Sequence, residues 1–387
     1  MVWREIMMEV HRYQLVLRGA YSKAATRGAG ARAGALLRMK FSDGVTGHAD
    51  LFPWPELGDA GLSELLQELT VALKKTDLKS DGDFTNAQQV LRKLADRDQR
   101  YLLLPRVFDA LCAEAEALRA QRPLVDGSIR NHFTALSAVQ LAPADVLDAR
   151  RGGFPAIKVK IAKRPPSSPS DTRGLIVLIK EGLIEEAKAL GRLQSHWDLP
   201  LRLDANENAT PDGVCAFLDA LPIRLRDAIE FIEDPFPFSL KQWSAFHKET
   251  GIRIAIDRPV MGFIGQHSDV KNRLSEVFSE NAAQIYVHKP AWLEDDVATV
   301  AAKAGVPVVV TSALGHPVGN LWAASVAARL APEGVHGCYT HTAYRDDEIS
   351  NSLIASKQLR GSRIFGMGVG LGLPAKSLNR IKWDKLL

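Results

Sequence analysis

The sequence has 387 residues, of which 46% are hydrophobic and 24% are charged, and its formal net charge is +4. A chain of this size and composition can bury a large core without disulfides, either as two domains or as one large barrel. The small, dispersed positive charge excludes a nucleic-acid-binding surface, and no apolar run approaches the ~20 residues that cross a bilayer.

The chain begins without a secretory h-region, because Arg4 and Glu5 interrupt the apolar residues. Its three cysteines are odd in number, far apart and not arranged as a CxxC pair; they are Cys112, Cys215 and Cys338. This cysteine usage is typical of a reduced compartment and does not fit a zinc site. We therefore expect a cytoplasmic protein with a small-molecule partner, no membrane or nucleic-acid partner, and no implied protein partner.

The first third of the chain predicts an α+β unit. Residues 9–51 alternate as antiparallel strands, interrupted by the segment 19–34, which is rich in Gly, Ala, Lys and Arg. Two interpretations of that segment stay open: a lid over a substrate, or a hairpin tip without function. A stiff aromatic corner follows at 52–55, and residues 63–120 have helical periodicity.

After Pro123 short β-rich segments alternate with amphipathic helices. The predicted strands are 133–141, 156–161, 201–205, 229–233, 252–257, 284–288, 306–311 and 335–340. Repeated strand–helix alternation implies parallel strands, and about eight such units close into an α/β barrel of the TIM type. We expect an α+β capping domain at 1–125, a barrel at 126–355, and a tail at 356–387 that returns to the cap.

The predicted strand 156–161 carries two lysines on one face. A strand has a side-chain period of two, so Lys158 and Lys160 point the same way, and Ile157, Val159 and Ile161 point to the other face. Taken alone, the pattern is typical of an edge strand with solvated lysines. The alternative is that an anionic group lies opposite the two ammonium groups.

Four consecutive predicted strands after it end in a charged residue: Asp204, Glu233, Asp257 and Lys289. A single Asp at such a place is usually a helix cap or a turn former. Four together predict an active site, because a barrel builds its site at the carboxyl ends of its strands. Three neighbouring carboxylates would repel one another, and an all-oxygen set suits Mg²⁺ better than Zn²⁺.

This set of groups predicts proton abstraction next to a carboxylate. A metal held by three carboxylates can hold a substrate carboxylate and stabilise the enediolate formed when its α-proton leaves. A lysine beside a second lysine and a cation has its charged form disfavoured, so it can serve as a base. Lys160 and Lys289, on opposite sides of the acids, could reach opposite faces of the reacting carbon.

These motifs resemble the enolase superfamily, and within it the o-succinylbenzoate synthases. The motifs run in order from Lys158 and Lys160 through 204–206 and 233–235 to Asp257 and 289–290. The resemblance covers nearly the whole chain and implies a modified (β/α)₇β barrel with an α+β cap completed by the C-terminal tail. It also implies Mg²⁺, or Mn²⁺ in its place, bound by Asp204, Glu233 and Asp257.

The resemblance further implies roles for individual residues. Lys160 would be the base and would then protonate the departing hydroxide, Lys289 would stabilise the enolate, and Lys158 would support Lys160 or the substrate carboxylate. Asn206 would lie behind the metal ligands. Substrate contacts would come from Arg27 and Trp54 of the cap and from Ser312 and Gly319 of the barrel.

The implied reaction is dehydration of 2-succinyl-6-hydroxy-2,4-cyclohexadiene-1-carboxylate to o-succinylbenzoate in menaquinone biosynthesis. The sequence departs from the family at Arg258, where an acid usually follows the third metal ligand, and at 311–319, which lacks the usual Glu. One alternative is a racemase or epimerase of N-acylamino acids or dipeptides on the same barrel. The other is a barrel that binds an acidic ligand without turnover, which only Arg258 favours.

Overall fold

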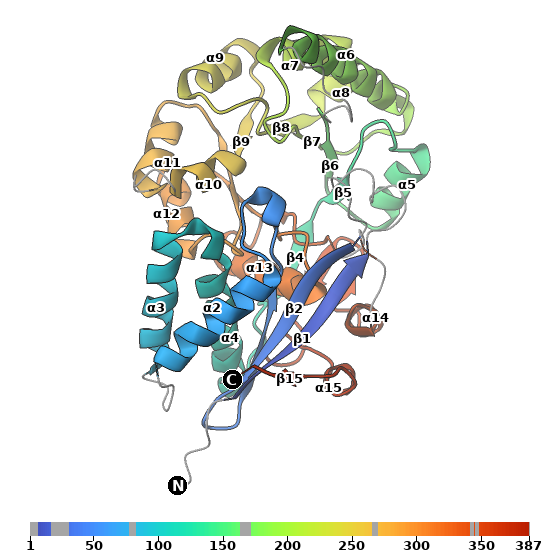
Figure 1. The fold of residues 1–387 in the computed structure, drawn as a ribbon. Coiled ribbons are helices and arrows are strands. Elements are labelled where there is room, and N and C mark those ends of the chain that lie inside the picture. The colour runs from blue at the N-terminus through green and yellow to red at the C-terminus, as the bar shows by residue number, and fades with distance from the viewer. Residues whose placement is uncertain are drawn as a thin grey trace.

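The computed structural model describes residues 7–16, 31–76, 83–162, 172–264, 270–340, 344 and 348–386. The helices and strands form two bodies, a cap of antiparallel strands and helices and a barrel above it in Figure 1. Most of the segment 19–34, including Arg27, lies outside the described residues. The division of the chain at residue 125 stays a prediction.

The cap sheet contains β1 (Met7–Val16), β2 (Ala31–Lys40) and β3 (Thr46–Leu51), all antiparallel. Alternate residues of β3 are buried, and the cap also contains the helices α2 (Leu62–Lys75), α3 (Asp83–Arg97) and α4 (Leu103–Arg119). Residues 31–34, predicted as part of a loop, belong to β2, because their backbone pairs with β1 out to Val16. Composition alone predicted a loop there, and the hydrogen-bonded ladder overrides it.

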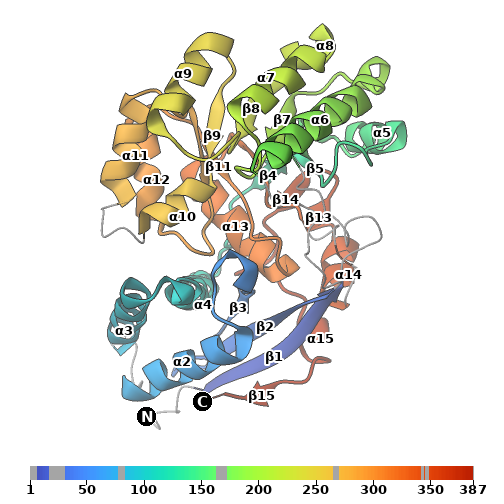
Figure 2. The same cartoon turned by 45° about the horizontal axis from the view of Figure 1, so that its top comes forward.

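The C-terminal tail returns to this sheet. After α14 (Glu348–Ala355) and α15 (Ala375–Leu378), β15 (Asp384–Lys385) pairs antiparallel with β1, and the backbone N–H of Leu386 donates to the carbonyl of Met8. Figure 2 shows β15 beside β1 at the edge of the cap. The first and last described strands of the chain therefore share one sheet.

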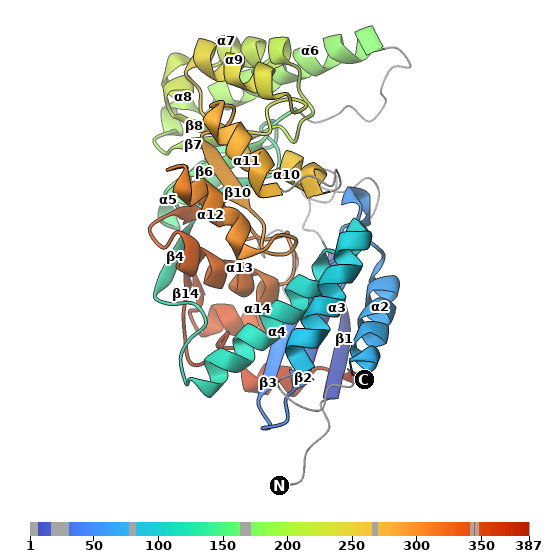
Figure 3. The ribbon, with the colours of Figure 1, turned by 90° about the vertical axis from the view of Figure 1, so that its left-hand side faces the viewer.

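The barrel contains seven parallel strands in the order β11-β10-β9-β8-β7-β6-β5. They are β5 (Phe133–Ala135), β6 (Ile157–Lys160), β7 (Leu201–Asp204), β8 (Ile229–Glu233), β9 (Ile254–Ile256), β10 (Ile285–His288) and β11 (Val308–Val310). The helices outside this curled sheet are α5 (Pro143–Arg151), α6 (Thr172–Gly191), α7 (Pro211–Ala220), α8 (Ile223–Asp227), α9 (Leu240–Thr250), α10 (Arg258–Ile264), α11 (Val270–Ser279), α12 (Asp295–Lys303) and α13 (Pro317–Leu330). Figure 3 shows them surrounding the strands, which confirms the predicted α/β barrel with an N-terminal cap.

The predicted strand 335–340 is shorter than expected and pairs elsewhere. Only β12 (Val335–His336) forms, and it joins β4 (Ser128–Asn131), β14 (Arg363–Phe365) and β13 (Leu359–Arg360) in a separate sheet. The imidazole Nδ1 of His336 accepts the backbone N–H of Val310, so a side chain replaces one bond of the expected ladder. Gly337 still bridges Thr311, and this contact joins the chain after β12 to the edge of the seven-stranded sheet.

In the part of the chain that the structure describes, no helix has the length and apolar character needed to cross a membrane.

Candidate active site

The two lysines of β6 point into the barrel. Ile157, Val159 and Ile161 on the opposite face are at most 2% exposed. β6 lies between β5 and β7 and is not an edge strand, and Lys158 is only 7% exposed. The interpretation of solvated lysines on an edge strand is therefore wrong, and the ammonium groups need buried anionic partners.

Those partners come from the next two strands. In the parallel register Lys160 lies beside Asp204, and Asp204 lies beside Glu233, so the three side chains occupy one row. The Nζ of Lys158 is 2.6 Å from Oε1 of Glu233 and 3.1 Å from Oδ2 of Asp204. The Nζ of Lys160 is 3.3 Å from the same Oδ2 of Asp204.

Lys289 and Asp257 lie on the other side of this row. Asp257 follows β9, Lys289 follows β10, and the ammonium of Lys289 donates to Oδ2 of Asp257. Because β6 and β10 are separated by β7, β8 and β9, Lys160 and Lys289 approach the acids from opposite sides. The structure thus brings together both predicted catalytic lysines and all three predicted metal ligands.

Burial and neighbouring charges shift these acids in opposite directions. Burial raises the pKa of Glu233 to about 7, and the charges of Asp204 and Asp257 add to this rise against the opposing ammonium of Lys158. Burial acts the same way on Asp204, but the ammonium groups of Lys158 and Lys160 outweigh it and hold its pKa below the usual range. Burial disfavours the ammonium of Lys158, yet Asp204 and Glu233 together raise its pKa. Lys158 therefore acts as a fixed cation between two acids.

A fourth acid, Asp234, follows Glu233 at the carboxyl end of β8. No role was predicted for it from the sequence. It is fully buried, its φ is +45°, and its two carboxylate oxygens accept the backbone N–H groups of Asp257 (3.0 Å) and Arg258 (2.9 Å). Burial, with the charges of Asp257 and Glu233, raises its pKa well above the usual range. The left-handed backbone and the following Pro235 mark a tight turn, but neither predicts which N–H groups the carboxylate binds.

Arg258, where this sequence departs from the family pattern, contacts the turn that follows β7. Its guanidinium donates to the backbone carbonyl of Asn206 (2.9 Å). Asn206, whose φ is +49°, in turn accepts from the Nζ of Lys160 through its side-chain Oδ1 at 3.4 Å. The positive charge of Arg258 is therefore directed at the turn that follows β7 and helps to fix Asn206.

The donor set suits a hard divalent cation. Three carboxylates stand at the ends of neighbouring strands, and burial together with the charges of Asp204 and Asp257 raises the pKa of Glu233, an effect that a bound cation would oppose. As the side chains stand, the ammonium groups of Lys158 and Lys289 neutralise these carboxylates. Among the described residues, no three His, Cys, Asp or Glu side chains are gathered closely enough to hold a metal. Binding of a cation therefore requires the oxygens of the three carboxylates to come closer together than they stand here.

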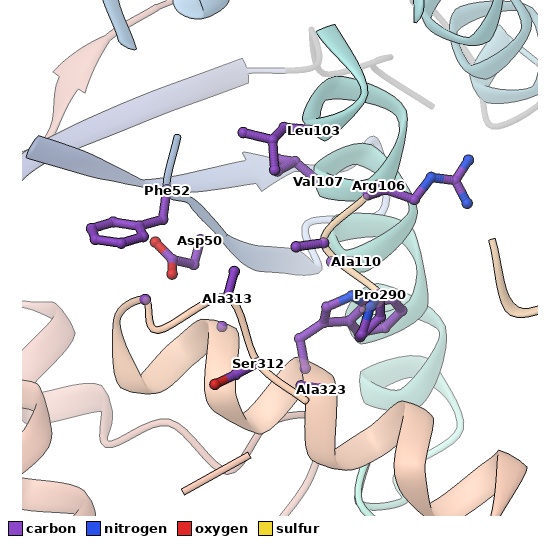
Figure 4. Close-up of a pocket in the computed structure, with 14 residues that line it drawn as sticks. Asp50, Phe52, Leu103, Arg106, Val107, Ala110, Pro290, Ser312, Ala313 and Ala323 are labelled. Carbon is purple, nitrogen blue, oxygen red and sulfur yellow. The ribbon is translucent and has the colours of Figure 1, made fainter. Parts of the chain in front are cut away.

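Ser312 and Gly319 lie at the joint between the cap and the barrel. They line a pocket with about 40 Å³ of free volume, whose other walls come from β3, α4, α13 and the loops after β10 and β11 (Figure 4). The hydroxyl of Ser312 shares a 2.8 Å hydrogen bond with that of Thr340. A Cβ built on Gly319 would lie 2.6 Å from Oδ2 of Asp50, and the same oxygen accepts the backbone N–H of His316. The carboxylate of Asp50, from the cap, therefore lies directly against Gly319 and the turn at His316.

Trp54 lies at the same joint, and 9% of its surface is exposed. The guanidinium of Arg32 stacks 3.4 Å from the centre of its ring, and its indole N–H donates to the carbonyl of Ala313 (2.8 Å). Arg32 is itself buried and contacts Glu56, but its Nε has no hydrogen-bond partner among the described residues. The sequence located the aromatic corner but placed Arg32 in the predicted loop 19–34 and gave no role to Asp50.

Comparison with known proteins finds similar sequences. Residues 8–80 match the family model described as the N-terminal domain of o-succinylbenzoate synthase. The chain is 26% identical to an o-succinylbenzoate synthase of Bdellovibrio bacteriovorus over 98% of this chain and 99% of that protein. It is also 30% identical to an o-succinylbenzoate synthase of an Enterobacter species, over 43% of this chain and 49% of that protein.

Solved structures share the fold. An N-succinyl Arg/Lys racemase from Bacillus cereus superposes with a TM-score of 0.73 at 13% identity, covering 99% of this chain and 100% of that one. A dipeptide epimerase from Enterococcus faecalis, in complex with Mg and the dipeptide L-Leu-L-Tyr, gives a TM-score of 0.73 at 16% identity, with coverage of 96% and 99%. The resemblance predicted from the sequence is confirmed: this chain has the enolase-superfamily fold and resembles o-succinylbenzoate synthases along nearly its whole length.

Proposed function

We propose that this protein is a Mg²⁺-dependent lyase that dehydrates 2-succinyl-6-hydroxy-2,4-cyclohexadiene-1-carboxylate to o-succinylbenzoate, a step of menaquinone biosynthesis. The observation that carries the proposal is the row of Lys160, Asp204 and Glu233 on adjacent parallel strands, closed on the far side by Lys289 and Asp257. Similarity to o-succinylbenzoate synthases over nearly the full chain supports this choice of reaction.

Asp204, Glu233 and Asp257 would hold the cation. When bound, Mg²⁺ supplies positive charge that stabilises negative charge developing on the substrate carboxylate. Lys158, wedged between Asp204 and Glu233, balances the buried acids and keeps their side chains beside β6. Asp234 holds the backbone of Asp257 and thereby fixes the direction from which that third acid reaches the site.

The two lysines have different roles in the dehydration. In the dehydration, the amine of Lys160 takes the α-proton as the C–H bond breaks, and it returns that proton to the hydroxide as the C–O bond breaks, so that water leaves. Asn206 and Asp204 hold Lys160 for both steps. The ammonium of Lys289, on the opposite side, stabilises the negative charge formed between the two bond cleavages.

A second candidate is racemisation or epimerisation of an N-acylamino acid or dipeptide. It is favoured by the same pair of lysines, since 1,1-proton transfer needs one group on each face of the reacting carbon. The Bacillus cereus racemase and the Enterococcus faecalis epimerase share this fold. In the dehydration, protons move on one face of the reacting carbon and Lys289 only stabilises charge. In a racemisation or epimerisation, Lys289 would itself transfer a proton.

The deciding experiment is a paired assay of the purified protein with added Mg²⁺. One arm follows o-succinylbenzoate formation from the cyclohexadiene substrate, and the other follows loss of optical activity or deuterium exchange for a panel of N-succinyl amino acids and dipeptides. The proposal predicts that kcat/KM for dehydration exceeds every value in the panel. Racemisation or epimerisation without dehydration would replace the first function by the second, and no turnover in either arm would indicate a binding protein.

A further inference from the structure

The loop that carries Lys289 is tied to the cap by an indole. Immediately after β10 the chain turns so that the carbonyl of Lys289 accepts the backbone N–H groups of Trp292 (3.1 Å) and Leu293 (3.0 Å). The Trp292 ring is buried, and its centre lies 5.9 Å from the Nζ of Lys289. Trp292 therefore contacts the lysine through both its backbone and its ring.

The partner of this indole is a carboxylate from the cap. The Nε1 of Trp292 donates to Oδ1 of Asp59 at 2.9 Å, across 233 residues of sequence. The other oxygen of Asp59 accepts the backbone N–H of Trp54 at 2.7 Å. Asp59 thus binds one donor from the cap and one from the barrel loop, and it is 9% exposed.

The two turns joined by Asp59 have further ties. On the cap side, Trp54 donates to Ala313 in the loop after β11. On the barrel side, Glu294 receives the guanidinium groups of Arg92 (3.0 Å) and Arg106 (2.7 Å) from α3 and α4. These other contacts hold the domains together, whereas Asp59 accepts the hydrogen bond of the indole that packs beside Lys289. Its particular effect is therefore on the lysine rather than on the attachment of the cap.

We propose that Asp59 is a positioning residue for the reaction: by binding the indole of Trp292 it fixes the loop and the ammonium of Lys289 against Asp257. The proposal rests on the proposed function in that Lys289 is taken as the group that stabilises the developing negative charge. It assigns to the cap a part in the chemistry itself, beyond any contact between the cap and the substrate.

The electrostatics of Asp59 favour positioning over stabilisation. Burial raises its pKa to about 6, against the two N–H donors, so keeping it ionised at neutral pH opposes folding. Asp59→Asn removes that buried charge but leaves one of the two N–H donors without a good acceptor. Because the two effects have opposite signs, we expect little change in Tm at neutral pH, together with a clear change at Lys289.

The test compares Asp59→Asn, Trp292→Phe and the double variant with Trp197→Phe as a matched control. Trp197 is also buried and donates its indole N–H to a backbone carbonyl, that of Leu199, but not to Asp59. The first readout is the rate at which acetic anhydride acetylates Lys289, measured by peptide mass spectrometry relative to Lys160. The second is the split of kcat and KM for dehydration.

We expect Asp59→Asn and Trp292→Phe each to speed acetylation of Lys289 severalfold relative to Lys160. Each should lower kcat between about 10- and 100-fold with little change in KM, because displacement of a reacting group by about 1 Å is enough for such a loss. The double variant should match the single ones, because both break the same contact. Trp197→Phe should change neither readout.

Acetylation rates and kcat values that match those of Trp197→Phe would overturn the proposal, and so would losses that add in the double variant. A fall in Tm with unchanged acetylation of Lys289 would show that Asp59 contributes to stability and does not position Lys289. The acetylation readout needs no turnover. If the wild-type protein fails to dehydrate the substrate, the proposed function fails, and the acetylation rates still decide the role of Asp59.

Discussion

Replacing Lys158 by Met tests whether its ammonium holds the buried acids. Methionine has a similar length and no charge, so Lys158→Met leaves Asp204 and Glu233 facing each other in a buried site. Removing one partner of a buried ion pair costs about 3–5 kcal/mol, because the remaining charge loses its compensation. We expect the free energy of unfolding in EDTA to fall by about that amount.

Magnesium should restore part of the loss, since the cation can take over the neutralising role at Asp204 and Glu233. A ligand at 100 times its Kd stabilises the folded state by about 2.7 kcal/mol. The loss should also shrink in acid: a carboxyl whose pKa is raised by folding binds its proton more tightly in the folded state, so the variant gains stability as pH falls.

The assay is urea unfolding followed by tryptophan fluorescence, with and without Mg²⁺. Lys188→Met is the control, because Lys188 forms an exposed ion pair with Glu185 on α6, and solvent screening leaves such a pair with little effect on stability. If Lys158→Met and Lys188→Met unfolded at the same urea concentration in EDTA, the ammonium of Lys158 would not be stabilising the acids.

Two further predictions concern the lysines and the pH dependence of stability. Lys160→Ala should lower dehydration by at least ~10²–10⁴-fold, because it removes the acid and the base together, whereas Lys289→Arg should keep measurable dehydration and lose any racemase activity; the opposite ranking in an o-succinylbenzoate assay would exchange their roles. Burial lowers the pKa of His336 to about 4. As the pH falls, the unfolded chain therefore binds a proton at this residue before the folded chain does, and protonation favours unfolding. The free energy of unfolding should fall by about 3 kcal/mol from pH 6.5 to 4. The free energy of unfolding, measured by urea titration, should change less between pH 6.5 and 4 in His336→Gln than in wild type. An equal pH dependence in both proteins would show that His336 is not the group responsible.

The parallel sheet and the charged strand ends could be predicted from the sequence because both follow from local pattern. The period of two placed Lys158 and Lys160 on one face, and each acid stood where an apolar run stopped. Parallel strands bring their carboxyl ends to one edge, so order along the chain became proximity in space. The pattern could not show that the Lys158 ammonium would lie between Asp204 and Glu233.

Contacts between the cap and the barrel could not be predicted in the same way. Asp59 meets Trp292 and Asp50 meets the turn at His316 only where the cap packs against the barrel. Neither acid belongs to a periodic pattern that would indicate its partner. Within the barrel, the sequence likewise did not indicate that the ring of His336 would accept the N–H of Val310 where the strand 335–340 was predicted.

The central claim is that the acid row binds Mg²⁺ and that Lys160 then dehydrates the substrate. The most direct measurement is o-succinylbenzoate formation by protein stripped with a chelator, before and after Mg²⁺ or Mn²⁺ is returned, for wild type and for Asp204→Asn. Wild type should lose activity on stripping and regain it with either metal, and Asp204→Asn should stay inactive at metal concentrations that restore wild type. Full activity of the stripped wild type, or full activity of Asp204→Asn, would contradict the claim.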